Sequence, residues 1–465
     1  MALRVTFHGG AGAVTGSNFL VEGTRGKLLI DCGLEQGKDF CAQCMYAPFP
    51  YDVPSLDALV ITHAHLDHIG RAPKLVREGF KGKAYMTEAT RDLMELMLSD
   101  SVNLLAQEAK RHGQQPLYEK QDVENLLSLV ETIPYHEERE IAPGLSIYLR
   151  DTGHILGAAS VRVKDTGDGT SAVFTGDIGN SPNPYLRDAE DVPDADAVIM
   201  EAVYGDRVHE HVDQRVPMLR DALKRALARG GTILMPAFSM ERTQLMLYEI
   251  SNLMEAGELP EFPVYLDSPL AIHVTGLYEK WAGEYFNDAA KAEMKKETSI
   301  FRFPFLTMTE SREDSETIAG APTPKLIIAG AGMSHGGRIG KWEAKYLPDP
   351  ATTLFIVGYQ APGSPGRLLQ DGASKVKLDG REVKVKAKVE SLTSWSAHAD
   401  REGLLKFAKG TLPRAKAIFV SIGEPSAQRF LAQRIHDFLG AKAIVPSQGE
   451  VWTITKEGVH REPDA

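Results

Sequence analysis

The sequence predicts an α/β fold in which a β-rich body is interrupted by an inserted α/β domain. Three stretches of the chain lead to this prediction. β-rich runs with short loops fill residues 1–206, strands alternate with helices over 207–373, and β-rich character returns over 374–465. A chain of 465 residues also exceeds the usual size of one hydrophobic core, so we expect more than one domain.

Short apolar runs bounded by Gly, Asp or Pro mark the expected strands of the body, at 28–30, 58–61, 172–174 and 197–200. Runs of this kind are typical of strands buried on both faces of a sheet. We expect two amphipathic helices among them, over about 89–111 and 121–131, the second with Asp122 near its start.

In the inserted domain, helices are expected at 214–229 and 241–255, alternating with strands at 232–235, 264–266, 325–328 and 353–357. This alternation predicts a parallel sheet. Beyond it, the run 383–389 alternates apolar residues with three lysines. Either a solvated edge strand or a strand that helps to bind phosphates would produce that pattern.

Composition excludes some classes of protein. With 43% hydrophobic and 25% charged residues the chain is globular rather than disordered. A net charge of −11 argues against a general nucleic-acid binder, although a local basic groove is compatible with it. No apolar run approaches the roughly 18 residues of a membrane span, and no signal peptide is evident. We therefore expect a cytoplasmic protein without a membrane partner.

The three cysteines are Cys32, Cys41 and Cys44. An odd number argues against a disulfide framework. Cys41 and Cys44 have the spacing of a redox or zinc pair, but no second pair completes a zinc site. We interpret them as loop thiols in a reducing compartment.

The strongest local signal is the segment 62–70, Thr-His-Ala-His-Leu-Asp-His-Ile-Gly. It follows the buried run that ends at Ile61, so rigid backbone supports the exposed side chains. Three imidazoles and one carboxylate suit a cation with nitrogen and oxygen ligands, foremost zinc. His63 and His65 can share one ion, and Asp67 and His68 can serve a second. Burying this cluster without a metal would cost several kcal/mol for each unpaired group.

Three other predicted strands end in polar residues next to glycine. His154 lies in the loop after a strand at 145–149, Asp177 follows the strand at 172–174, and Asp31 ends the strand at 28–30. Taken singly, each is as well explained by an ordinary turn. The Gly-rich segment 8–16 leads into a strand rather than a helix. It therefore does not match a dinucleotide fingerprint, and we expect it to pack beside the metal site.

Taken together, these motifs in this order closely resemble the metallo-β-lactamase superfamily, from Phe7 to the last strand. The resemblance implies a four-layer αββα sandwich with two zinc ions. His63, His65 and His154 would hold the first ion, and Asp67 and His68 the second. Asp177 would bridge the two ions, and Asp31 would orient the loop from behind the ligands.

Two further motifs resemble those of the β-CASP branch, RNA-processing metallo-nucleases related to the nuclease subunit of the cleavage and polyadenylation specificity factor. Glu201 lies at a strand end shortly before Tyr204-Gly205, and His398 is the centre of Ser394–Asp400. The segment between them matches the branch's inserted cap domain in position and size. The resemblance implies an RNA-cleaving phosphodiesterase, with endonucleolytic and 5′-exonucleolytic modes both open.

The implied mechanism is attack on phosphorus by a metal-activated hydroxide. Asp67 and Asp177 would position the water, and His398, held cationic by Glu201, would protonate the leaving oxygen. Arginines and small hydroxyls suit phosphate oxygens, although each arginine is equally suited to pair with a structural carboxylate. The predicted substrate contacts are Arg242, Arg338, Arg367 and Ser268.

One position departs from the pattern. RNA-cleaving members of the branch carry a histidine before Gly-Glu after the last strand, and Ile422 occupies that position here. Isoleucine cannot ligate, so the second zinc site should be the weaker. DNA-processing members also have an aliphatic residue there. A DNA-directed nuclease acting on single-stranded DNA, and a non-catalytic RNA-binding relative with a weakened metal site, are therefore the alternatives. A small-molecule hydrolase would need neither the His398 motif nor the insertion. The sequence leaves a homodimer open.

Overall fold

The computed structural model describes residues 2–35, 45–209, 214–361, 363–378, 380–412 and 414–463. Cys41 and Cys44 lie outside these residues. The chain divides into two compact units, which we call unit 1 (Met1–Val208 with His398–Ala465) and unit 2 (His209–Ala397). Among the described residues, no helix combines the length and the apolarity that crossing a membrane requires.

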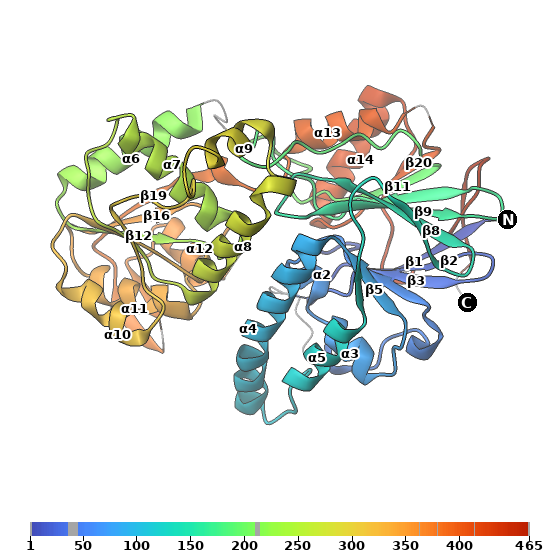
Figure 1. Ribbon diagram of the computed structural model, residues 1–465, viewed down its shortest axis with the longest axis horizontal. Coiled ribbons are helices and arrows are strands. Elements are labelled where there is room, and N and C mark those ends of the chain that lie inside the picture. The colour runs from blue at the N-terminus through green and yellow to red at the C-terminus, as the bar shows by residue number, and fades with distance from the viewer. Residues whose placement is uncertain are drawn as a thin grey trace. The chain divides into compact units, whose positions relative to one another are not determined.

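Unit 1 contains two sheets that pack face to face (Figure 1). The eight-stranded sheet has the order β23-β22-β1-β2-β3-β4-β5-β6, with bounds β1 (Leu3–Gly9), β2 (Asn18–Glu22), β3 (Lys27–Ile30), β4 (Ala58–Val60), β5 (Lys83–Met86), β6 (Val130–Thr132), β22 (Val451–Ile454) and β23 (Val459–Arg461). The seven-stranded sheet has the order β21-β20-β11-β10-β9-β8-β7, with bounds β7 (Glu138–Ala142), β8 (Leu145–Asp151), β9 (Ala159–Asp165), β10 (Ser171–Phe174), β11 (Ala197–Met200), β20 (Ala417–Val420) and β21 (Ala443–Ile444).

Apolar side chains from both sheets form the core between them, including Val5, Leu28, Val161 and Phe419. Helices cover the two outer faces, which gives four layers, αββα (Figure 1). On one side lie α2 (Leu66–Ile69), α3 (Ala72–Arg77), α4 (Glu88–His112) and α5 (Lys120–Ser128). On the other side, α13 (Arg401–Gly410) and α14 (Pro425–Leu439) bury their apolar faces against β10, β11 and β20.

Unit 2 is built on a six-stranded sheet with the order β14-β13-β15-β12-β16-β19, and every pairing in it is parallel. Its strands are β12 (Thr232–Pro236), β13 (Val264–Leu266), β14 (Leu306–Met308), β15 (Lys325–Ala329), β16 (Thr353–Ile356) and β19 (Lys388–Ser391), and a separate hairpin consists of β17 (Lys375–Leu378) and β18 (Arg381–Lys384). Its α-helices are α6 (Arg215–Ala228), α7 (Arg242–Glu255), α8 (Pro269–Tyr285), α9 (Asp288–Met294), α10 (Arg312–Thr317), α11 (Gly337–Tyr346) and α12 (Pro365–Gln370). The parallel sheet follows from the alternation of strands and helices in the sequence.

Two details differ from the sequence-based expectations. The helix expected over 121–131 ends at Ser128, and β6 begins at Val130. The lysine-rich run 383–389 is not one strand. It is divided between β18 and β19, and the amides of Lys386 and Ala387 both donate to the Leu347 carbonyl between them.

Unit 2 extends to Ala397, beyond residue 373, where the inserted domain is expected to end. Strand β19 is the reason. It pairs in parallel with β16, so residues 388–391 complete the sheet of unit 2 instead of returning to unit 1. Unit 2 begins at His209, and the expected bounds of the inserted domain, 207–373, stay a prediction.

Candidate metal centre

The predicted metal ligands all follow the ends of strands in unit 1. His63 and His65 lie between β4 and α2, His154 follows β8, and Asp177 follows β10. The loop that carries Asp177 passes so close to Thr62 that only glycine fits at position 176, directly before Asp177. A Cβ at Gly176 would lie 2.7 Å from the Thr62 Cβ, and Gly176 has φ +55°. Close packing of these two loops brings Asp177 to the histidines.

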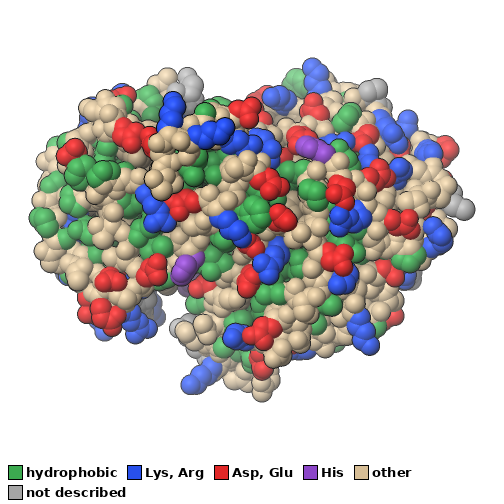
Figure 2. Space-filling model, viewed as in Figure 1, with side chains coloured by type: hydrophobic (Ala, Val, Ile, Leu, Met, Phe, Trp, Pro, Cys, Tyr) green, Lys and Arg blue, Asp and Glu red, His purple; other side chains and the backbone are tan. Residues whose placement is uncertain are grey.

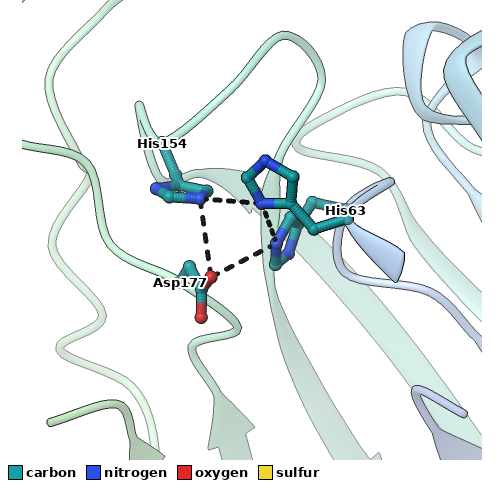
Figure 3. A group of neighbouring side chains, drawn as sticks. His63, His154 and Asp177 are labelled. Carbon is teal, nitrogen blue, oxygen red and sulfur yellow. Dashed lines mark hydrogen bonds and ion pairs between the residues drawn. The ribbon is translucent and has the colours of Figure 1, made fainter. Parts of the chain in front are cut away.

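Four donor atoms from these loops form one tight group (Figure 3). His63 Nε2 is 3.1 Å from His65 Nδ1, and His154 Nε2 is 3.2 Å from the same His65 atom. Asp177 Oδ2 is 3.3 Å from His63 Nε2 and 3.4 Å from His154 Nε2. Figure 3 shows His63, His154 and Asp177 pointing toward a common centre.

These distances fit a tetrahedral cation. Zinc bonds of about 2.0–2.1 Å to nitrogen and oxygen place neighbouring ligand atoms about 3.3–3.4 Å apart in a tetrahedron. The four separations given above are 3.1–3.4 Å, and all four atoms lie within 4.8 Å of one another. Burial lowers the pKa of His63, and lowers those of His65 and His154 well below the usual value. Neutral imidazole is the form that binds a metal.

A second set of donors adjoins the first. His68 Nε2 is 3.4 Å from Asp177 Oδ1 and 3.9 Å from Asp67 Oδ2. Two of these atoms, His68 Nε2 and Asp177 Oδ1, are buried without a hydrogen-bond partner among the described residues. Buried polar atoms without partners are costly, and a cation between them would satisfy both. Asp67 and His68 are not part of the tight group of four.

Asp31 supports His68 from behind. Its Oδ2 lies 2.7 Å from His68 Nδ1 and also accepts from Ser17 Oγ at 3.1 Å, while Oδ1 accepts from the Thr62 amide at 2.9 Å. Burial would lower the pKa of His68, but Asp177 and Asp31 outweigh it and raise that pKa well above the usual value, so a cation at Nε2 would have to displace a proton. The hydrogen bond to Nδ1 leaves Nε2 facing Asp177, which is the orientation that a ligand needs.

The Gly-rich segment 8–16 contacts the loop after β20, and its packing beside the metal site stays a prediction. Within the segment, the Gly10 carbonyl accepts from the Ile422 amide. Directly after the segment, the Ser17 amide donates to the Asp67 carbonyl at 2.9 Å. Ile422 itself is 3% exposed and belongs to the apolar core between the sheets. It therefore offers no ligand to the second set of donors.

His398 and Glu201 form a pair beside the metal ligands. The His398 segment reaches this place because the Ala399 amide donates to the Ile178 carbonyl at 2.8 Å. His398 Nδ1 is 3.2 Å from Glu201 Oε2 and 3.9 Å from Asp177 Oδ2. Burial would lower the pKa of His398, but the Glu201 and Asp177 carboxylates outweigh it and raise that pKa to about 9. At neutral pH His398 is therefore a cation beside Asp177, a predicted metal ligand.

Two predicted substrate contacts in unit 2 have structural partners. Arg338 Nη1 donates to Asp267 Oδ1 at 2.6 Å, and Asp267 is fully buried. Arg242 is buried and donates to the Val357 carbonyl. Both guanidinium groups hold unit 2 together, and their contact with phosphate stays a prediction.

The other two predicted contacts lie at helix starts or on the surface. Ser268 is the N-cap of α8, where its hydroxyl accepts from the Ala271 amide at 3.3 Å. Arg367 forms an exposed ion pair with Asp371, four residues later on the chain, at 3.0 Å. An exposed pair of this kind is weak, so Arg367 is the more readily available of the two for a ligand. Its role also stays a prediction.

Sequence reasoning missed the residues that hold the His154 loop. Asp151 Oδ1 accepts from the Gly153 amide at 2.9 Å, and its Oδ2 accepts from Arg187 Nε at 2.9 Å. The Asp151-Thr-Gly153 pattern was the available signal, because aspartate often bonds the amide two residues later. Ser17 and Thr62, which support Asp31, carry no signal of this kind because their partners are distant in sequence.

Packed sheets that present a buried His–Asp donor group on their loops define a metal-dependent hydrolase. Three family models match the chain: the metallo-beta-lactamase superfamily over residues 11–237, the Beta-Casp domain over 243–369, and the Zn-dependent metallo-hydrolase RNA specificity domain over 382–446.

Several curated relatives match most of the chain. Ribonuclease TTHA0252 of Thermus thermophilus is 36% identical over 408 residues, which cover 88% of this chain and 91% of that protein. Transcription termination factor FttA of Methanosarcina mazei is 33% identical over 454 residues, which cover 93% and 69%. An RNase J-like protein of Methanocaldococcus jannaschii is 29% identical and is covered to 99%. A crystal structure of a protein of unknown function from Enterococcus faecalis V583 is 12% identical and covers 98% of this chain with a TM-score of 0.59, which supports the fold alone.

The chain belongs to the metallo-β-lactamase superfamily, in the branch with an inserted Beta-Casp domain. The predicted family, the αββα fold with a β-CASP insertion and the enzyme class, a hydrolytic ribonuclease, are confirmed by these matches. That the chain binds metal is supported by the superfamily and by the His–Asp group.

Proposed function

We propose that this protein is a zinc-dependent phosphodiesterase that cleaves RNA at the loop ends of unit 1. The observation that carries the proposal is the group of four donor atoms within 3.1–3.4 Å of their neighbours. Three nitrogen donors and one oxygen donor favour zinc over magnesium or calcium, which prefer oxygen ligands.

In this proposal His63, His65, His154 and Asp177 hold one zinc ion. Asp67, His68 and Asp177 would hold another, and Asp31 would orient His68. The second ion is bound more weakly, because Ile422 adds no donor to these three. Bound zinc supplies the Lewis acidity that activates water near neutral pH and draws charge from phosphate oxygens.

His398 is the proposed general acid. Its raised pKa keeps it protonated at neutral pH, and its distance from Glu201 lets that carboxylate hold the ring through Nδ1. Nε2 is then the atom that gives a proton to the departing ribose oxygen. Asp67 and Asp177 orient the attacking water through their carboxylates. His398 could instead be a metal ligand, because one atom each of Asp177, Glu201 and His398 lie within 4.8 Å of one another. Metal content of a His398→Ala variant separates the two roles.

RNA is the proposed substrate for two reasons. Residues 382–446 match an RNA specificity domain, and two of the relatives are named as a ribonuclease and as an RNase J-like protein. Single-stranded DNA is the alternative substrate, motivated by Ile422, and a non-catalytic RNA-binding role is the alternative to catalysis. We also propose that the protein forms a homodimer, and its mass in solution tests this. A cytoplasmic location is supported by Cys32, a buried free thiol of the kind that reducing compartments maintain.

A substrate panel tests the proposal. Wild-type protein is incubated with labelled single-stranded RNA, labelled single-stranded DNA and a chromogenic ester, with and without chelator. We expect RNA cleavage that chelator abolishes and zinc restores. The His398→Ala variant should retain zinc and lose about 10²–10⁴ in rate. Faster cleavage of DNA than of RNA would make single-stranded DNA the substrate. Binding of RNA without cleavage would support the non-catalytic role. Hydrolysis of the ester alone would show that the protein is not a nuclease.

A further inference from the structure

A surface pocket of about 590 Å³ lies within unit 2, away from the residues of the metal centre. It is lined by Arg225, Arg229, Lys388, Glu390 and Ser391. The two arginines come from the carboxyl-terminal turn of α6 and its C-cap. Residues four apart share one face of a helix, so both can point into the same space. The other three residues belong to β19, where Lys388 and Glu390 share one face of the strand.

The charges in this pocket do not cancel. Arg225 pairs with Glu390 at 2.9 Å. Arg229 donates to the Pro350 carbonyl and pairs with no carboxylate in the described ranges of the chain. Lys388 is exposed and pairs with no carboxylate among the residues that the structure describes. Three cations and one carboxylate give the pocket a formal charge of +2, in a chain whose net charge is −11.

The surroundings of the pocket favour a local positive field. On the face in Figure 2, basic and acidic side chains are interspersed, without one large area of either sign. The segment that leads into β19 is different. Lysines alternate along it and all are exposed: Lys375, Lys377, Lys384, Lys386 and Lys388. Between the first and the last of these, the sequence contains only two acidic residues.

Each cation has an ordinary structural explanation when taken singly. Arginines at the end of α6 stabilise the helix dipole, and a lysine on β19, the edge strand of its sheet, discourages pairing with another chain. These reasons do not explain why the cations meet around one concavity together with a serine hydroxyl. Guanidinium, ammonium and hydroxyl groups together are the set that binds phosphate.

We propose that this pocket binds backbone phosphates of single-stranded RNA and thereby anchors the substrate on unit 2, outside the metal centre. The inference rests on the proposed function, because it takes RNA as the substrate. RNA is favoured over an acidic peptide because Lys388, Glu390 and Ser391 lie within the segment that matches an RNA specificity domain. The lysines of the preceding hairpin, β17 and β18, contact further phosphates along the same RNA.

The test measures RNA binding without catalysis. A labelled, unstructured RNA of about 30 nucleotides is titrated with chelator-treated protein at several salt concentrations, and anisotropy gives Kd. In single-stranded RNA each phosphate contact contributes about −0.7 to the slope of log K against log salt. The double variant Arg229→Gln/Lys388→Gln should therefore reduce the slope by about 1.4 and weaken binding about tenfold near 0.15 M salt.

Lys295→Gln is the matched control, since it removes an exposed lysine of unit 2 that does not line the pocket. It should leave Kd and slope close to those of the wild type. Thermal melting followed by circular dichroism checks that the variants fold. The single variant Lys388→Glu provides a second reading if the double variant unfolds, and it should also weaken RNA binding.

The outcomes separate this inference from the proposed function. If wild-type protein with zinc does not cleave RNA, the proposed function fails first. If it cleaves RNA but the double variant keeps the wild-type Kd and slope, the pocket proposal alone is overturned. Polyglutamate that binds the pocket as tightly as RNA would make it a peptide site. Inorganic phosphate that binds as tightly as RNA would make it a site for free phosphate. Either result would overturn the proposal.

Discussion

Replacing Glu201 with glutamine tests the proposed proton donor most directly. The substitution keeps the size of the side chain and an acceptor oxygen, but it removes the carboxylate charge 3.2 Å from His398 Nδ1. With Asp177, that charge outweighs burial and raises the pKa of His398 to about 9. Without it the pKa of His398 should fall toward the usual value of about 6.5.

The expected loss of activity depends on pH. With a pKa of about 9, His398 is about 90% protonated at pH 8, whereas with a pKa of about 6.5 it would be about 3% protonated. Since only the protonated ring can act as the acid, kcat at pH 8 should fall by up to about thirtyfold. At about pH 6 both forms are mostly protonated, so the loss there should be less than about twofold. The alkaline limb of the kcat profile should therefore move to lower pH.

The assay is kcat for cleavage of labelled RNA across this pH range at saturating substrate, with zinc content measured on the same samples. Glu249→Gln is the matched control. It also removes a buried carboxylate, whose pKa burial raises to about 7, but it lies in unit 2 outside the site. Equal losses at both pH values would show that Glu201 does not act through the charge of His398. Loss of zinc from Glu201→Gln would make this residue part of the metal site.

His154→Ala removes one of the four grouped donors, so metal affinity should fall by more than about tenfold. Wild-type metal content by mass spectrometry would contradict the ligand set. Asp31→Asn keeps a residue that tolerates the positive φ of +58° but withdraws the carboxylate from His68. Binding of the second metal should weaken by about 10–100-fold in equilibrium dialysis, and unchanged affinity would show that other contacts hold His68. Zinc added to metal-stripped protein should bind in two unequal steps, because Ile422 provides no donor. Two equally tight equivalents in calorimetry would refute this reasoning.

Much of the site could be predicted because its residues sit where strands end. Buried apolar runs identify β4, β10 and β11 from sequence alone, and the polar residues that follow them must lie at the sheet edge. The segment 62–70 needed no tertiary information, since its three histidines and one aspartate are close in sequence. Burial without a cation would have been too costly for them.

Contacts between distant segments could not be predicted in this way. Ser17 and Thr62 support Asp31, and Asp151 holds the His154 loop, but hydroxyls and carboxylates of this kind are common and do not indicate their partners. The end of unit 2 also depends on a contact between distant segments. A lysine-alternating run fits any exposed strand, and only its pairing with β16 shows to which sheet it belongs.

The sequence by itself determined the family, the order of strands and helices, and the chemical identity of the candidate metal donors, because periodicity and residue type are local properties. Only the tertiary structure decided which donors share a centre, that His398 lies beside Asp177, that Arg338 is engaged by Asp267, and that a basic pocket exists between α6 and β19. The physical reason is that distances between residues far apart in sequence depend on how whole sheets and helices pack, and no short stretch of sequence contains that information.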